Sequence, residues 1–443
     1  MRKYKIRLNR KKFRRRMFGF LLILILIIGS IIFVPKYLSE HAQKQNPGKT
    51  TVRSTDVSYV LRDSGGVKVT AALTLIQDYF TTYYTSMGTL KTSDLTKQFD
   101  MNDALGYQSA LINQAAMDYM IVYRSSGVND LGFANCTCGV TITDVSKGGD
   151  SLTVKLVSDE EEQFAYLGDT TSSMCGIEHT FVLKKTDNGY LILSHEYEDS
   201  AYLSIEETVQ AYTKSNASAS NEELKQVIDS KRADLEEQAK NNLSAYETQR
   251  QSYNANPSSF GLNLSCDHVY NRNDAVSYSD QWVGETEVIR NDSVWETYDY
   301  AGGNCSNYVS QCVYAGGIPM DAKGNQIWKW YSDTPDSTSA KTGRSPSWTQ
   351  VDYFYDYCSD NTGYGIAAEI ANNLYSADLG DVVIMDWGDG WSHVVMITQV
   401  VKDANGNVTD YLINSNTSDR NNYPLSAYGC VKMSVIRIAG WNN

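Results

Sequence analysis

The sequence predicts an α+β protein with an apolar N-terminal helix and two folded parts joined by a charged helical linker. In residues 57–202, helix-spaced apolar residues come first and alternating, strand-like segments follow. Residues 263–443 begin with a helical layer, continue with segments typical of an antiparallel sheet, and contain all eight tryptophans. Helices followed by runs of strands favour α+β over a regular alternation of strands and helices.

The N-terminus predicts a membrane anchor. Residues 1–16 hold ten Lys/Arg and no acid, and residues 17–34 are 18 consecutive apolar or small residues. Such a run is just long enough to cross a bilayer, so we assign a transmembrane signal anchor to 17–35. The basic flank should stay in the cytoplasm, which places the rest of the chain outside the cell. A cleaved signal peptide is the alternative, although no small-residue cleavage site follows.

The charge of the outer portion argues against nucleic acid as a partner. The remaining 29 Lys/Arg and 52 Asp/Glu give residues 35–443 a net charge of −23. A polyanion would be repelled by such a surface, and the acidity is best explained by solubility. Residues 36–56 are polar, with Pro and Gly, and are predicted to form a stalk. The oligomeric state is not readable.

Residues 57–202 are expected to form the first folded part. Two helical runs, 68–86 and a second from 101, precede strand-like segments at 138–145, 150–158 and 178–197. The last segment contains the hairpin signal Asn188-Gly189. This order resembles the cone-shaped SnoaL-like (cystatin-like) fold, in which a curved sheet wraps a long helix. No acid/base pair is evident here, so a spacer or binding module is expected.

Residues 203–262 are predicted to be a solvated connecting helix. Glu and Lys/Arg alternate along it, and no apolar seam repeats over several heptads as a coiled coil would require.

The stretch "YAGGNCSNYVSQCVYAGG" (300–317) contains the candidate nucleophile. A helix is predicted from Cys305 to about Ala315, after a Gly-Gly approach and with Asn304 as its N-cap. Cys305 therefore lies in the first turn, where free N–H groups and the helix dipole favour a thiolate and could bind an oxyanion. Cys312 lies on the inward face and is interpreted as a core residue.

Of five histidines, His393 has the most suitable position for the general base, because it opens the strand "WSHVVMITQV" in the same part of the chain. A hairpin centred on Asn405-Gly406 brings Asn416 beside His393 as the orienting residue. Asn414 and Asp386 are the alternatives, of which Asp386 is expected to make a turn or backbone contact. Trp391 is placed near a substrate.

These motifs resemble the putative amidase domain family of bacterial surface proteins, which is related in layout to papain-like cell-wall hydrolases. The resemblance covers about Tyr270 to Ile438. It is carried by "YNRNDAVSYSDQW", "GGNCSNYVSQCVYAGG", "LGDVVIMDW", "WSHVVMIT" and "NTSDRNNYPLS". It implies a papain-like α+β fold with Cys305 as nucleophile and His393 as base. Two positions depart from the family pattern: Asn304 stands where Asp is usual, and Asn416 where His is frequent.

Another cysteine-rich group suggests a metal site or a disulfide. Cys136, Cys138, Cys175 and His179 could supply four zinc ligands, although the Cys-x-Cys spacing differs from the usual zinc knuckle. A disulfide from Cys175 and unpaired thiols are the alternatives, and connectivity is not readable. The reaction expected for this chain requires no metal or organic cofactor.

Together these features predict a membrane-anchored extracellular thiol hydrolase that cleaves amide bonds, with peptide or peptidoglycan as substrate. Cys305 attacks, His393 transfers the proton and Asn416 orients the ring. A catalytically silent cell-surface binding or scaffold protein is the alternative. The bond cleaved, and hydrolysis against group transfer, stay open.

Overall fold

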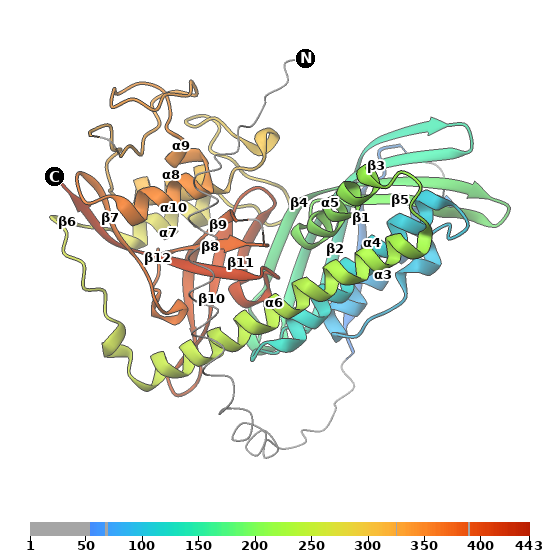
Figure 1. The fold of residues 1–443 in the computed structure, drawn as a ribbon, viewed down its shortest axis with the longest axis horizontal. Coiled ribbons are helices and arrows are strands. Elements are labelled where there is room, and N and C mark those ends of the chain that lie inside the picture. Colours follow the sequence, from blue (N-terminus) through green and yellow to red (C-terminus); the bar gives the residue numbers. More distant parts are fainter. Residues whose placement is uncertain (1–53, 67–69, 325, 389) are drawn as a thin grey trace. The chain divides into compact units, whose positions relative to one another are not determined.

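One long, mostly antiparallel sheet runs through the part of the chain that the structure describes (Figure 1). The structure is a computed structural model and describes residues 54–66, 70–324, 326–388 and 390–443. The strand order is β1-β2-β3-β4-β11-β10-β9-β8-β12-β6, with β5 beside β4 and β7 beside β12. Among the described strands, only β1 and β2 pair in parallel. The predicted α+β class is therefore confirmed.

The first half of the sheet carries two long helices, α3 (Thr70–Thr89) and α4 (Ala104–Ser126). Its strands are β1 (Asp56–Asp63), β2 (Phe133–Gly148), β3 (Ser151–Phe164), β4 (Ser172–Thr186) and β5 (Gly189–Tyr197). The predicted Asn188-Gly189 turn joins β4 to β5, with Thr186 opposite Gly189. Strand β1 was not predicted, because its alternating polar residues resemble those of the stalk.

The helices bury their apolar faces against this half-sheet. α4 begins at the N-cap Asp103, whose carboxylate accepts the backbone N–H of Leu105 at 2.9 Å. The fully buried Phe80, Met117 and Phe181 come from α3, α4 and β4 and meet in one core. Burying each such side chain contributes about 1.5–3 kcal/mol, so this core stabilises the arrangement of helices on sheet.

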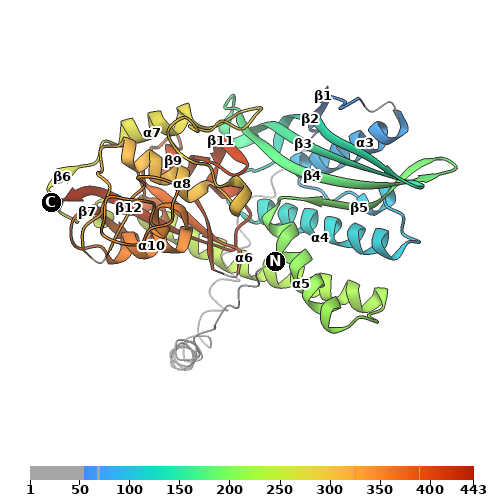
Figure 2. The same ribbon diagram turned by 90° about the horizontal axis from the view of Figure 1, so that it is seen from above.

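Two helices follow, α5 (Ser200–Ser215) and α6 (Asn221–Ala255). A capping box starts α6, in which the Glu223 carboxylate accepts the Ser220 backbone N–H at 2.8 Å. α6 packs on α4 and extends along the second half of the sheet (Figures 1 and 2). There Tyr246 accepts the backbone N–H of Met433 at 2.5 Å. The linker is therefore helical, as predicted, but it lies against both halves instead of crossing solvent.

The second half surrounds a short helix, α8 (Cys305–Ala315), with the bounds that the sequence predicts. Its other helices are α7 (Arg272–Gln281), α9 (Pro346–Thr349) and α10 (Val351–Asp360). Its strands are β6 (His268–Val269), β7 (Gly365–Ile370), β8 (Val382–Asp386), β9 (Trp391–Lys402), β10 (Val408–Ser415), β11 (Asp419–Pro424) and β12 (Lys432–Asn442). Short 3₁₀ turns complete the fold.

The second half-sheet is buried on both faces. Val394 and Met396 of β9 pack in a core with α7, α8 and α10, while Val395 and Ile397 belong to the core on the other side. The two half-sheets join where β11 pairs with β4, with Asp419 opposite Cys175. All described residues therefore belong to one compact unit.

Among the described residues, no helix is both long and apolar enough to cross a membrane. The predicted anchor at 17–35, the basic tail at 1–16 and most of the stalk lie outside them.

Candidate active site

Cys305 is the first residue of α8, and its side chain is 6% exposed. Gly302 and Gly303 precede it with φ of +100° and +119°, backbone angles that favour glycine. A Cβ at Gly303 would come within 2.9 Å of the Thr417 hydroxyl. The Gly-Gly pair therefore allows the turn at Thr417 to lie directly against the start of the helix.

Asn304 holds the N-cap position, but its side chain does not cap the helix. Its Oδ1 accepts instead from the Tyr298 backbone N–H at 3.2 Å and from Asn307 Nδ2 at 2.9 Å. The first N–H groups of α8 are thereby left for the sulfur of Cys305.

Two features of its surroundings have opposite effects on the pKa of the Cys305 thiol. Burial raises the pKa of the Cys305 thiol to about 11, against the N–H groups of Val394 and Ser306 and the Thr417 hydroxyl, which favour the thiolate. The expectation that the helix start alone lowers this pKa is corrected, because loss of water outweighs the dipole. The resting group is therefore a thiol, surrounded by donors that would stabilise its charged form.

Thr417 adopts a strained backbone, with φ of +99° in a β-branched residue. Its hydroxyl accepts the Asn304 backbone N–H at 2.9 Å, and its carbonyl accepts from Arg290 at 3.1 Å. Arg290 also pairs with the buried Asp419 at 2.5 Å. Sequence reasoning missed Thr417, since nothing in "NTSD" distinguishes a strained turn from an ordinary one.

His393 lies on β9 opposite Met385 of β8, and it lines the same cleft as Cys305. Its Nε2 is 2.8 Å from the hydroxyl of Tyr428, which lies 2.9 Å from the Ser415 hydroxyl. Burial, and after it the positive charge of Arg420, lower the pKa of His393 to about 3. Among the described residues, no hydrogen bond joins the Cys305 thiol to the His393 ring. The resting ring is therefore neutral.

The structure does not place Asn416 beside His393. Its Oδ1 accepts from Asn304 at 3.1 Å, and its Nδ2 donates to the Trp282 carbonyl at 3.2 Å. The predicted register is one residue off, since Asn414 pairs with Met396 and bulges interrupt the β9–β10 ladder. β10 then ends at Ser415, so Asn416 belongs to a turn. Tyr428 occupies the place beside the ring that was predicted for Asn416.

The alternatives named from the sequence also point away from the ring. Asn414 donates to Asp280 at 2.9 Å. Asp386 accepts the backbone N–H groups of Gly388 and Gly390 at 2.6 and 3.0 Å, which is the turn contact expected of it. Trp391 packs on Tyr355, 5.5 Å between ring centroids. The tryptophan that lines the cleft is Trp387.

The cleft has a volume of about 850 Å³ and lies between α5 and the Cys305 site. One wall comes from Ser204 and Thr208 of α5 and Lys231 of α6. The opposite wall contains Cys305 and His393. Helix α5 therefore forms part of the lining of the cleft that contains Cys305 and His393.

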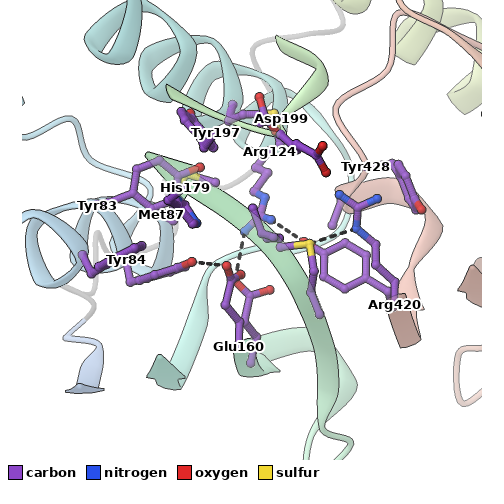
Figure 3. A pocket seen from close by; sticks show the side chains of 18 of the residues that line it. Tyr83, Tyr84, Met87, Arg124, Glu160, His179, Tyr197, Asp199, Arg420 and Tyr428 are labelled. Atoms are coloured by element: carbon purple, nitrogen blue, oxygen red, sulfur yellow. Dashed lines mark hydrogen bonds and ion pairs between the residues drawn. The ribbon is translucent and has the colours of Figure 1, made fainter. Parts of the chain in front are cut away.

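A second, narrow cavity of about 50 Å³ is lined by residues of the first half and by Arg420, Tyr423 and Tyr428 of the second (Figure 3). Glu160 and Glu162 of β3 point into it with Arg124 of α4, all at most 4% exposed. Burial, and after it the neighbouring Glu162, raise the pKa of Glu160 to about 8. Sequence analysis did not identify these two carboxylates, which both point inward because alternate residues of a strand share a face.

No metal site is formed by the described residues, among which no group of three or more potential ligands converges. Cys136 and Cys138 are buried, and His179 bonds to Ser158 and His195 at 3.0 Å each. All eight cysteines are free thiols.

An α+β scaffold with a cysteine at a helix start and a histidine in the same cleft is typical of thiol hydrolases. Residues 269–439 match the model of the family described as "Putative amidase domain". The description indicates an amide-hydrolysing function.

A relative shares part of this region. The chain is 31% identical over 153 residues to "Uncharacterized protein YhbB" of Bacillus subtilis (strain 168). The match covers 34% of this chain and 42% of the relative, so the chain spans less than half of the relative's length. No solved structure matches the chain.

Proposed function

We propose that this protein is a cysteine amidase that cleaves amide bonds of cell-wall peptides at the outer face of the membrane. The observation that carries the proposal is the shared cleft of Cys305 and His393, with four hydrogen-bond donors around the sulfur. The family description supports amide hydrolysis. The predicted anchor at 17–35 and the net charge of −23 beyond residue 34 support a membrane-bound extracellular location without nucleic acid.

In the proposed reaction His393 accepts the thiol proton as Cys305 attacks the amide carbonyl carbon. A thioester forms when the C–N bond breaks, and the protonated ring gives its proton to the leaving amine. Water then adds to the thioester with His393 as base, and the thiol is restored. Because Nε2 is bonded to Tyr428, Nδ1 is the ring nitrogen assigned to the thiol.

The N–H groups at the start of α8 are assigned to the oxyanion of this reaction. The Cys305 and Ser306 N–H groups act on the sulfur in the resting protein. As the tetrahedral intermediate forms, the negative charge moves from the sulfur to the carbonyl oxygen, and the same N–H groups can then donate to that oxygen. Removing one such donor from an oxyanion hole costs about 10²–10³ in rate.

The proposal includes the finer fold assignments. Residues 263–443 form a papain-like domain, and residues 57–202 a SnoaL-like unit whose curved sheet surrounds the narrow cavity. The 203–262 linker supplies α5 as a wall of the cleft.

A silent binding protein is the second candidate, and one observation favours it. The resting thiol and ring are both neutral, unlike the ion pair of many cysteine hydrolases. A binding protein would keep the cleft, and removal of the Cys305 sulfur would leave its binding unchanged.

The test is to incubate purified full-length protein with peptidoglycan fragments and to identify products by mass spectrometry. Cys305→Ala should abolish the release of amines, while Cys266→Ala, the same substitution at a thiol outside the cleft, should leave it unchanged. If wild type and Cys305→Ala release the same products, the enzyme proposal fails; if both bind fragments equally and neither cleaves them, the binding protein is correct.

A further inference from the structure

Arg420 differs from the other four arginines of the second half of the chain in its charge partners. Residues 263–443 contain five of them, and four pair with carboxylates. Those four are Arg272, Arg290, Arg344 and Arg437. Among the described residues, no carboxylate lies within ion-pair distance of the Arg420 guanidinium. A charge that is half-buried and unpaired is costly, which points to a ligand that completes it.

Arg420 is nevertheless held in one place. Its guanidinium carbon lies 4.2 Å from the ring centroid of Tyr428 and 5.4 Å from that of Tyr423, and Nε donates to the sulfur of Met174 at 3.1 Å. Figure 3 shows Arg420 beside Tyr428 at one end of the narrow cavity. Aromatic faces and a thioether do not neutralise a cation, and the carboxylates of Asp199, Glu160 and Glu162 act on it only from beyond ion-pair distance, so its N–H groups are not taken up by a carboxylate.

Arg420 also lines the large cleft, together with Cys305 and His393. The Tyr428 ring separates it from the base, since the Tyr428 hydroxyl bonds to Nε2 of His393 at 2.8 Å. An anion bound by Arg420 would thus lie one aromatic ring away from the proposed proton acceptor. Glu198, Glu207 and Asp299 also line the cleft and would repel an anion that approaches them.

We propose that Arg420 binds a carboxylate of the substrate and thereby selects amides that carry a free carboxylate near the cleaved bond. The assignment rests on the proposed amidase function and names its substrate class. A guanidinium presents parallel N–H groups that match the two oxygens of a carboxylate, and such charge-assisted pairs are about twice as strong as neutral hydrogen bonds. Peptides offer a carboxylate at the C-terminus or on an acidic side chain.

The first test compares iodoacetate with iodoacetamide on full-length protein. Both alkylate Cys305 by displacement of iodide. They have nearly the same shape, but iodoacetate carries a carboxylate where iodoacetamide carries a neutral amide. The ratio of the iodoacetate rate to the iodoacetamide rate at Cys305, divided by the same ratio for glutathione, should exceed one in the wild type. Arg420→Met should lower this ratio about tenfold, and Arg420→Lys should retain part of it because the charge remains. Lys231→Met removes the other cation of the same cleft and should leave the ratio unchanged.

This measurement does not depend on amide cleavage, so it separates failure of the carboxylate site from failure of the enzyme. The proposal is overturned if wild type and Arg420→Met give the same ratio, or if Lys231→Met lowers it equally. Should Arg420→Met not fold, the wild type alone decides: sodium acetate should slow iodoacetate to the rate of iodoacetamide, and acetamide should not. Equal effects of the two additives overturn the proposal.

The second test locates the carboxylate in the substrate. Cell-wall peptides are compared with the same peptides amidated either at the C-terminus or at the acidic side chain. Amidation at the bound position should lower kcat/KM about tenfold in the wild type and leave Arg420→Met unchanged. If neither amidation changes kcat/KM in the wild type, Arg420 does not select the substrate.

Discussion

The hydroxyl of Tyr428 lies 2.8 Å from Nε2 of His393 and 2.9 Å from the hydroxyl of Ser415. A phenol in this place fixes the orientation of the ring and, in the proposed reaction, leaves Nδ1 for the thiol. Because a neutral phenol cannot stabilise an imidazolium as a carboxylate does, its contribution is mainly one of orientation.

Tyr428→Phe should lower kcat about tenfold with little change in KM, because the ring loses its partner but the cleft keeps its shape. Steady-state kinetics on a cleaved wall fragment measures both constants. Asn416→Ala is the matched comparison, since Asn416 was the sequence-based choice for this role. A larger loss of kcat in folded Asn416→Ala than in Tyr428→Phe would contradict the assignment.

The Cys305 thiol should behave as a weak acid in the resting protein. Burial raises its pKa to about 11, so alkylation by iodoacetamide should increase with pH well beyond the range in which an ordinary thiol, with a pKa of about 8.5, becomes fully reactive. Mass spectrometry of the Cys305 peptide, native against urea-unfolded, gives both curves. Rapid native labelling at pH 5–6 would show instead that an ion pair with His393 exists.

Thr417 should matter through its hydroxyl. Thr417→Val removes a donor that favours the thiolate, so the alkylation curve of Cys305 should move to higher pH and kcat should fall about tenfold. Thr417→Ser keeps the donor and should resemble the wild type in both measurements. Equal curves for the Val and Ser variants would show that the strained turn serves only to shape the backbone.

The α5 wall predicts a size-dependent effect. Thr208→Trp should lower kcat/KM for large wall fragments more than tenfold, while leaving iodoacetamide labelling of Cys305 unchanged because the reagent is small. Gln210→Trp places the same side chain on an exposed part of α5 outside the cleft lining and is the control. If both Trp variants cleave large fragments at the wild-type rate, α5 does not contact the substrate.

The two buried histidines of the first half-sheet should oppose folding in mild acid. Burial lowers the pKa of His179 to about 3 and that of His195 well below its usual range, so the unfolded state binds more protons below pH 6.5. Their contribution to the free energy of unfolding should fall as pH decreases from 6.5 toward 3, by about 1.4 kcal/mol per pH unit for each histidine, while Glu160, whose pKa burial raises to about 8, acts in the opposite sense. Urea unfolding between pH 7 and 4 measures the slope.

His179→Gln should reduce this slope, and the exposed His268→Gln should not. A slope unchanged by His179→Gln would mean that His179 does not contribute to the acid dependence.

Local signals in the sequence predicted much of the fold. The bounds of α8 follow from Gly-Gly pairs on either side of an apolar run, and the β4–β5 turn follows from Asn188-Gly189. Cys305 and His393 were found because a helix start and a strand start are visible in the sequence.

The missed features depend on long-range pairing. Tyr428 comes 35 residues after His393 and reaches it after the chain has passed along β10 and β11, which pair with each other. The register at His393 depends on bulges within the β9–β10 ladder, which the turn residues do not reveal. Burial likewise decides the charge of the Cys305 thiol, and burial is a property of the assembled fold.

The junction of β11 with β4 bears on how this protein can be divided experimentally. In the whole chain, β11 has β10 on one side and β4 on the other. A fragment starting at residue 263 would lack β4, and Asp419–Asn421 would then expose unpaired N–H and C=O groups along an open edge. Such edges recruit strands from other molecules, so the isolated fragment should aggregate unless that edge is blocked. It would also lack the α5 wall, so its activity, if measured, would describe a wider and less selective enzyme than the native one.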